Sequence, residues 1–102
     1  MTPVVLMAGQ NAHQKVPDEV YIALLSKRKT NLTVQKTMYY QNKLKGKKYL
    51  IIENDEKPDS PKRRYKIESI SEGTGQTVED IYGTLITGPH IVLNLKLREK
   101  TK

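Results

Sequence analysis

Residues 65–89 read YKIESISEGTGQTVEDIYGTLITGP, and this stretch decides the predicted fold. Its first six residues combine β-branched and aromatic side chains, so residues 65–70 predict a strand. The apolar residues that follow lie at i, i+3, i+4 and i+7, one stripe of a helix: Val78, Ile81, Tyr82 and Leu85. Thr77 is the expected N-cap of this helix, and Gly88-Pro89 is its expected end.

The same order of signals occurs 44 residues earlier, without a gap. Six identities align at this spacing: Leu6 with Leu50, Pro17 with Pro61, Tyr21 with Tyr65, Thr30 with Thr74, Thr33 with Thr77 and Val34 with Val78. We interpret residues 3–46 and 47–90 as two copies of one strand-strand-helix motif of about 44 residues. Ligand sites often form where such units meet.

The alignment assigns the remaining elements of the two copies. It predicts strands at 4–7, 20–25 and 49–52 and a helix at 33–44. Residues 20–25 also suit the first turns of a helix behind an Asp18 cap, because so short an apolar run has no clear period. Within 33–44, alternation of apolar residues would also suit a strand, and we prefer the helix because the copies should agree.

A closing strand is predicted at residues 91–98, where Ile91, Leu93, Leu95 and Leu97 alternate with more polar positions. Polar residues 9–17 and charged residues 53–64 predict loops. The chain of 102 residues has room for one modest core, so we expect a single α+β domain over residues 1–102. Its helices are expected on one face of the sheet.

Composition excludes several classes of site. The chain has no cysteine, which excludes disulfides, thiolate catalysis and cysteine-based zinc sites. No apolar run approaches the length of a membrane span, and residues 1–7 have no basic region typical of a signal peptide. We therefore expect a cytoplasmic protein that does not associate with membranes.

Catalytic and metal-binding signatures are weak throughout. The only histidines, His13 and His90, lie in no ligand-spaced cluster. Residues 72–77 contain two glycines but no P-loop lysine, and they predict a tight turn. The acidic residues of 53–59 lack the pattern of a calcium loop and predict a solvated surface. We expect no enzyme activity, no cofactor and no metal.

Basic clusters suggest one function, the binding of nucleic acid without sequence specificity. The formal net charge is +7. The candidate residues are Lys27, Arg28, Lys29, Lys43, Lys45, Lys47, Lys48, Lys62, Arg63, Arg64 and Lys66. Four tyrosines lie near them in the sequence and could stack on unpaired bases. An ordinary solubilising surface would have the same composition.

The predicted repeat suggests the other function, which we rank slightly higher. A protein or peptide segment would bind in the groove between the two copies, adding as a strand. Tyr21 and Tyr65 occupy equivalent positions in the copies and would frame that groove. The same two tyrosines would equally suit packing in the core or between the copies.

The duplicated pattern also carries a resemblance. Tyr21…Thr30…Thr33-Val34 and Tyr65…Thr74…Thr77-Val78, in a short cysteine-free chain rich in lysine and tyrosine, resemble the small orphan accessory proteins of filamentous viruses that infect hyperthermophilic archaea. The resemblance implies a viral protein in the host cytoplasm. It implies no catalytic residue.

Overall fold

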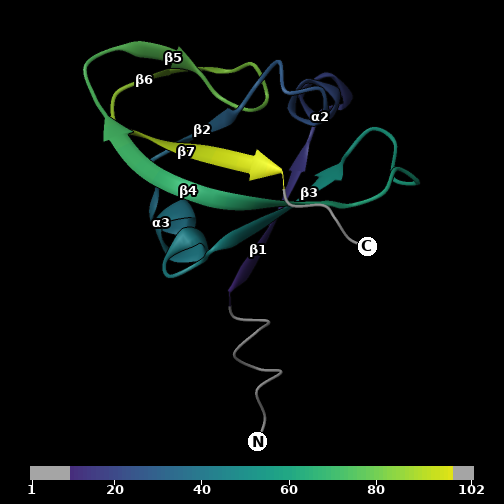
Figure 1. The fold of residues 1–102 in the computed structure, drawn as a ribbon. Coiled ribbons are helices and arrows are strands. Elements are labelled where there is room, and N and C mark those ends of the chain that lie inside the picture. Colours follow the sequence, from purple (N-terminus) through teal and green to yellow (C-terminus); the bar gives the residue numbers. More distant parts are fainter. Residues whose placement is uncertain (1–9, 98–102) are drawn as a thin grey trace, which may run out of the picture.

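Five strands form one mixed sheet with the order β1-β3-β4-β7-β2 (Figure 1). The computed structural model describes residues 10–97. The strands of this sheet are β1 (Asn11–Val16), β2 (Asn31–Gln35), β3 (Tyr49–Asn54), β4 (Arg63–Gly73) and β7 (His90–Leu97). Two short strands, β5 (Thr77–Glu79) and β6 (Leu85–Thr87), form a separate hairpin. The helices are α2 (Asp18–Leu25) and α3 (Met38–Leu44). The α+β class predicted from the sequence is confirmed.

One pair of neighbouring strands is parallel, and the other three are antiparallel. β1 runs parallel to β3, and α2, β2 and α3 form the long connection between them. β2 lies at the far side of the sheet, beside β7. β4 lies between β3 and β7 and is the longest strand, with a register shift between Ile67 and Ser69. Such irregularities increase the local twist of a sheet, and β4 is visibly curved.

Alternate residues of the strands point into one aliphatic core. The clearest alternation is in β7, where Ile91, Leu93 and Leu95 are buried and Lys96 is exposed. Leu50 and Ile52 of β3 point to the same side. Because successive side chains of a strand face opposite ways, the residues between them form an outer face of the sheet.

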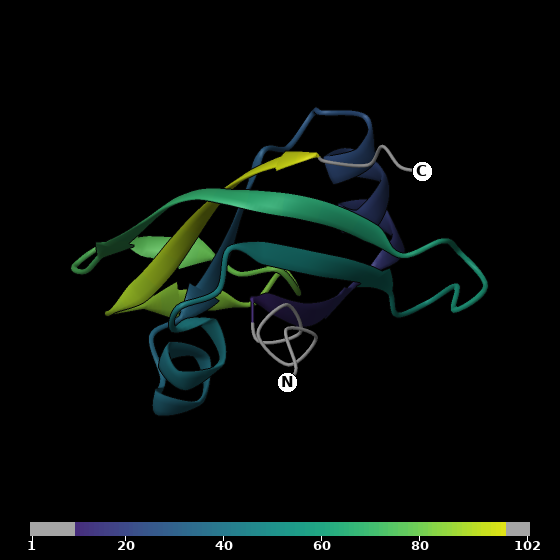
Figure 2. The same ribbon diagram turned by 60° about the horizontal axis from the view of Figure 1, so that its bottom comes forward.

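The two helices lie at opposite ends of β1 and β3 (Figure 2). α2 begins directly after the end of β1, and α3 ends shortly before β3 begins, so the parallel direction of these strands separates the helices. α2 buries Tyr21 and Leu24, and α3 buries Leu44. All three residues belong to the one core that the sheet covers, so both helices pack on the core side of the sheet.

A turn between β5 and β6 connects the two outermost strands of the sheet. The N–H of Ile81 donates to the carbonyl oxygen of Thr33 in β2 at 3.2 Å. The hydroxyl of Tyr82 donates to the carbonyl oxygen of Lys15 in β1 at 2.9 Å. The sheet is thus curved far enough for one short segment to reach both edges.

Three predicted strands are found in the structure. The predictions at 49–52 and 65–70 lie within β3 and β4, and the closing strand at 91–98 matches β7 up to Leu97. Residues 55–62 form the loop between β3 and β4, inside the predicted loop. The strand predicted at 4–7 lies outside the described residues.

The predicted helix at 77–88 is wrong, because this segment forms the hairpin β5–β6. The Asp80 carboxylate accepts hydrogen bonds from the N–H groups of Tyr82 and Thr84, both at 2.9 Å. Gly83 adopts a positive φ of 80°, which leaves the helical region. These contacts reverse the direction of the chain after the three residues of β5.

Three other expectations are corrected. Residues 20–25 lie in α2, because Asp18 and Glu19 occupy a first turn that favours acids and Pro17 precedes it. The helix predicted at 33–44 divides into the end of β2 and α3, which begins behind the Thr37 cap. The loop predicted at 9–17 contains β1.

The two-copy repeat is not confirmed, since aligned residues such as Tyr21 and Tyr65 lie in different kinds of element.

Candidate functional site

The outer face of the sheet combines basic and aromatic side chains from four strands. We call this surface the basic face, and its residues are His13, Lys15, Tyr49, Arg64, Lys66 and Lys96. The strand register aligns Tyr49 with Lys66, and Lys66 with Lys96. A row of side chains therefore crosses three neighbouring strands, although its members are far apart in the sequence.

Tyr49 and Arg64 form a stacked pair on the basic face. The guanidinium carbon of Arg64 lies 4.6 Å from the centroid of the Tyr49 ring. This is a cation–π contact, and it holds the two planar groups together on the surface. The pair offers the aromatic ring of Tyr49 with the positive charge of the Arg64 guanidinium directly beside it.

Lys66 and Lys96 face each other directly across two antiparallel strands. Like charges in this position destabilise a sheet. The ion pairs formed within residues 10–97 involve His13 with Glu53, Lys36 with Glu72 and Lys57 with Asp18, so none of them neutralises this pair. Glu68, also on β4, is the nearest acid along that strand. The two ammonium groups therefore favour an anion between them.

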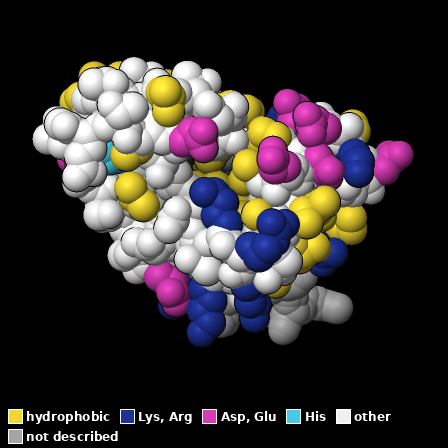
Figure 3. Space-filling view, turned by 90° about the horizontal axis from the view of Figure 1, so that it is seen from above, with side chains coloured by type: hydrophobic (Ala, Val, Ile, Leu, Met, Phe, Trp, Pro, Cys, Tyr) yellow, Lys and Arg dark blue, Asp and Glu magenta, His cyan; other side chains and the backbone are white. Residues whose placement is uncertain are grey.

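One acid, Glu53 of β3, lies on the basic face in register with Lys15 and is paired with His13, but many other acidic side chains gather elsewhere. Seen from above, most Asp and Glu side chains lie over α2 and the loop after β3, whereas Lys and Arg side chains lie mainly along the middle and front (Figure 3). Asp18 and Glu19 begin α2, and Asp55, Glu56 and Asp59 lie in the loop. The acids of α2 and of this loop therefore lie away from the Lys66–Lys96 pair.

A hollow of about 310 Å³ adjoins the basic face beside β1 and is lined by tyrosines. Gln14 organises its floor: its Nε2 donates to the Lys15 carbonyl at 2.9 Å, and its Oε1 accepts from Lys43 Nζ at 2.9 Å. Burial raises the pKa of the Tyr40 and Tyr82 hydroxyls above the ordinary value of a phenol. We call this hollow the tyrosine pocket.

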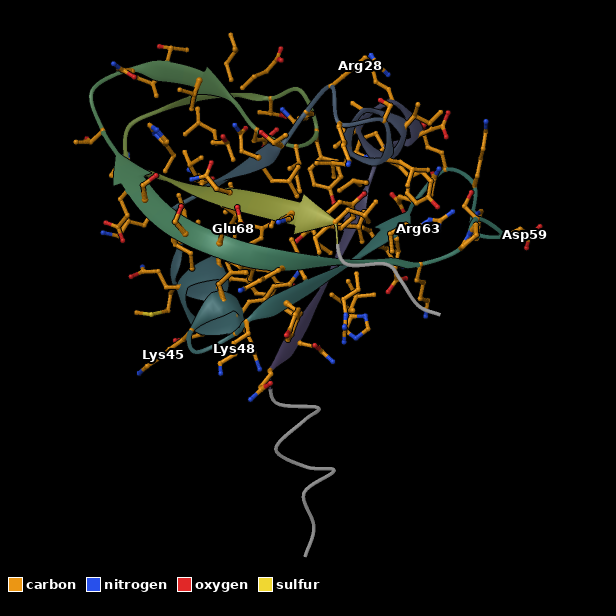
Figure 4. All side chains as sticks on the ribbon, in the orientation of Figure 1. Arg28, Lys45, Lys48, Asp59, Arg63 and Glu68 are labelled. Carbon is orange, nitrogen blue, oxygen red and sulfur yellow. The ribbon has the colours of Figure 1, made fainter. Side chains whose placement is uncertain are left out.

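The basic residues predicted from the sequence do not form one site. Figure 4 shows Arg28 near α2, and Lys45 and Lys48 near the opposite end of the strands. The Arg63 Nε donates to the Tyr21 hydroxyl at 3.4 Å, so its head points toward the core side. Of the predicted residues, Arg64 and Lys66 belong to the basic face.

A smaller hollow of about 160 Å³ brings in part of the first cluster. Lys27 and Lys29 line it together with Leu24, Tyr65 and Lys96. Lys96 thus connects this hollow with the basic face. Lys96 is not among the site residues predicted from the sequence, although the alternation of residues 91–98 places it on the polar side of the strand.

Tyr21 and Tyr65 are core residues, which corrects their assignment to a partner-binding groove. Their exposed fractions are 6% and 2%. The Tyr21 hydroxyl donates to the carbonyl oxygen of Pro61 at 2.6 Å. Since α2 and β4 are different kinds of element, the two tyrosines do not frame a symmetric groove.

The described residues contain neither a metal site nor a membrane span. Within residues 10–97, no three His, Asp or Glu side chains are grouped so as to hold a metal ion. Neither α2 nor α3 is long and apolar enough to cross a membrane.

No protein-family model, no curated protein and no solved structure matches this chain.

Proposed function

We propose that this protein is not an enzyme and binds single-stranded nucleic acid, without sequence specificity, through the basic face. The observation that carries the proposal is the unneutralised pair Lys66 and Lys96 beside the stacked pair Tyr49 and Arg64. Binders of single strands combine positive charge that follows the backbone with aromatic rings on which bases stack.

The size of the basic face supports a short stretch of single-stranded nucleic acid as its ligand. Neighbouring strands lie about 4.8 Å apart, so the four strands from β1 to β7 span about 14 Å. Cations occur on three of these strands, from Lys15 on β1 to Lys96 on β7, and β3 between them contributes Tyr49 and the acid Glu53. A single phosphate would use only one part of it.

A single strand suits this surface better than a duplex. Bases stack on Tyr49 only when they are unpaired. A helix that enters the major groove is the common means of reading a duplex. α2 begins with Asp18 and Glu19, which repel phosphate, and α3 has only seven residues.

Binding of a protein segment is the second candidate. Its best support is a groove of about 440 Å³ between α3 and the β4–β7 pair, where Met38 and Ile70 are exposed. Lys45 and Glu72 carry opposite charges at this groove, so its charge indicates no particular partner. We rank this candidate second for that reason.

Titration of a labelled single strand and a labelled duplex at several salt concentrations tests the proposal. We expect tighter binding of the single strand, with an affinity that falls steeply with salt because counterions are released. In the double variant Lys66→Ala/Lys96→Ala, the log–log salt slope should decrease by about 1.4, or about 0.7 for each lost phosphate contact.

The matched control removes two lysines from the loop after β3, in the variant Lys57→Ala/Lys62→Ala. It changes net charge equally but leaves the basic face intact, so it should keep most of the wild-type affinity and slope. Equal loss in both variants would mean that only net charge matters, and absence of binding at low salt would refute the proposal. The viral origin and the host cytoplasm remain predictions on which this proposal does not depend.

A further inference from the structure

The tyrosine pocket has the composition of a site for one planar, electron-rich ring. Three tyrosines, three basic side chains, one amide and one acid line it: Tyr39, Tyr40, Tyr82, His13, Lys15, Lys43, Gln14 and Glu53. The acid Glu53 lies 3.2 Å from His13 Nδ1, so its partner is His13, and the other cations of the pocket are Lys15 and Lys43. Its volume of about 310 Å³ is at the lower end of the range for small-ligand sites.

The tyrosine rings are held in place but remain accessible. Tyr39 and Tyr40 meet edge to face, with centroids 5.0 Å apart and an interplanar angle of 79°. The Tyr82 hydroxyl is fixed by its hydrogen bond to Lys15. Tyr39 and Tyr82 are nevertheless 64% and 49% exposed. Large apolar surface left exposed around a hollow often marks a binding site.

The charge inside the pocket selects the class of ligand. Lys43 Nζ lies 5.4 Å from the Tyr39 centroid and 5.6 Å from the Tyr40 centroid. Its position is also fixed by Gln14. An aromatic cage that already holds its own ammonium group repels a second cation, so methylated amines and choline-like ligands do not suit it. An aromatic ligand with an attached anion does.

We infer that the tyrosine pocket binds one unpaired base of the strand, stacked on Tyr39, while Lys43 and Lys15 contact a neighbouring phosphate. This inference rests on the proposed function and specifies where a base leaves the path of the strand. His13 and Lys15 belong both to the pocket and to the basic face, so the two surfaces are continuous at β1. A nucleic-acid strand that crosses the sheet from β7 to β1 would reach the pocket at one end of its path.

The test compares a short oligonucleotide with an abasic strand of the same length, which has the phosphates but no bases. We expect Tyr39→Ala to weaken binding of the oligonucleotide about fivefold to a hundredfold, the usual effect of one stacked base. Tyr39→Phe keeps the ring and should restore the affinity. Neither variant should change binding of the abasic strand.

Leu85→Ala is the matched control, because Leu85 is an equally exposed apolar residue on β6, outside the pocket. The chain contains six tyrosines and no tryptophan, so tyrosine fluorescence gives an independent readout of stacking. Unchanged oligonucleotide affinity in Tyr39→Ala would overturn the inference and leave the proposed function standing. If wild-type protein binds neither strand, the proposed function itself fails.

A free nucleoside monophosphate identifies the source of the base. Quenching of tyrosine fluorescence by the monophosphate, with no effect of Tyr39→Ala on strand binding, would assign the pocket to free nucleotides and overturn the inference. Quenching by the strand at much lower concentration, lost in Tyr39→Ala, would support it.

Discussion

The imidazole ring of His90 lies directly against the backbone of Gly73, its paired residue on the neighbouring strand. A Cβ atom added to Gly73 would be only 2.6 Å from His90 Nε2. The ring is buried, and its Nδ1 donates to the carbonyl oxygen of Gly88 at 3.0 Å. His90 therefore occupies the space that any other residue at position 73 would need.

The first prediction is that Gly73→Ala destabilises the protein by about 1–3 kcal/mol, the usual cost of overpacking. Urea unfolding measures the change in free energy of unfolding. The control repeats the substitution in a His90→Ala background, where the added methyl group has room and should cost much less. An equal cost in both backgrounds would refute the contact as the cause.

The second prediction concerns Asn54, a buried side chain that joins the end of β3 to the start of α2. Its Nδ2 donates to Asp18 Oδ1 at 2.8 Å, and its Oδ1 accepts from the N–H groups of Glu56 and Lys57. Asn54→Ala removes all three hydrogen bonds and should cost about 1–3 kcal/mol of stability.

Asn94→Ala is the comparison for this substitution, because Asn94 donates to the Ser69 hydroxyl on the surface. Water can replace that bond, so its loss should cost less than about 0.5 kcal/mol. Thermal unfolding of both variants provides the measurement. If the two substitutions cost the same, the bonds of Asn54 do not organise this loop.

The third prediction is a pH effect at the same place. The hydrogen bond from Asn54 lowers the pKa of the Asp18 carboxyl, with a smaller contribution from Lys57. The ionised form is thus favoured in the folded state, and this stabilisation is present above the unfolded-state pKa. It is lost as the pH falls through the lower folded-state pKa. An NMR titration of the carboxyl should show the lowered pKa, and Asn54→Ala should raise it toward the ordinary value.

The fourth prediction concerns the tyrosine pocket at alkaline pH. Burial raises the pKa of Tyr40 and Tyr82, so their phenols ionise more readily in the unfolded chain. The folded state then holds more protons, and stability should fall as the pH rises past about 10. Urea unfolding between pH 8 and 10.5 measures this slope. Tyr40→Phe should make the slope shallower, and an unchanged slope would contradict the assignment.

The sequence predicts those strands whose period is strong enough to be read locally. Alternation of Ile91, Leu93 and Leu95 identifies β7, and the apolar run that begins at Tyr49 identifies β3. The error at 77–88 arises because a helix and a hairpin can both have four apolar residues at this spacing, and the spacing does not reveal the turn. That turn depends on Asp80, whose side chain binds two backbone N–H groups.

The expected repeat leads to further errors, because each segment is assigned the same kind of element as its aligned partner. Alignment with 65–70 predicts a strand at residues 20–25, although Pro17, Asp18 and Glu19 are typical of a helix start.

The candidate site was less predictable than the fold, because it depends on strand pairing. Arg64 and Lys66 share a face by simple alternation, which a sequence shows. That Lys96 lies opposite Lys66 follows from the register of β4 and β7, two strands that are about 30 residues apart. Tyr82 reaches Lys15 only because the sheet curves. These relationships come from long-range packing.

The last prediction separates stability from binding at Lys66 and Lys96. Lys96→Glu replaces a repulsive pair with a cross-strand ion pair, so the variant should be more stable by about 0.2–1 kcal/mol. The same change introduces a negative charge into the basic face and should weaken single-strand binding. Urea unfolding and a salt titration on one preparation measure both effects. Lys96→Gln removes only the repulsion and should give smaller changes in each. A variant that gains stability and keeps its affinity would show that these lysines serve no anionic ligand.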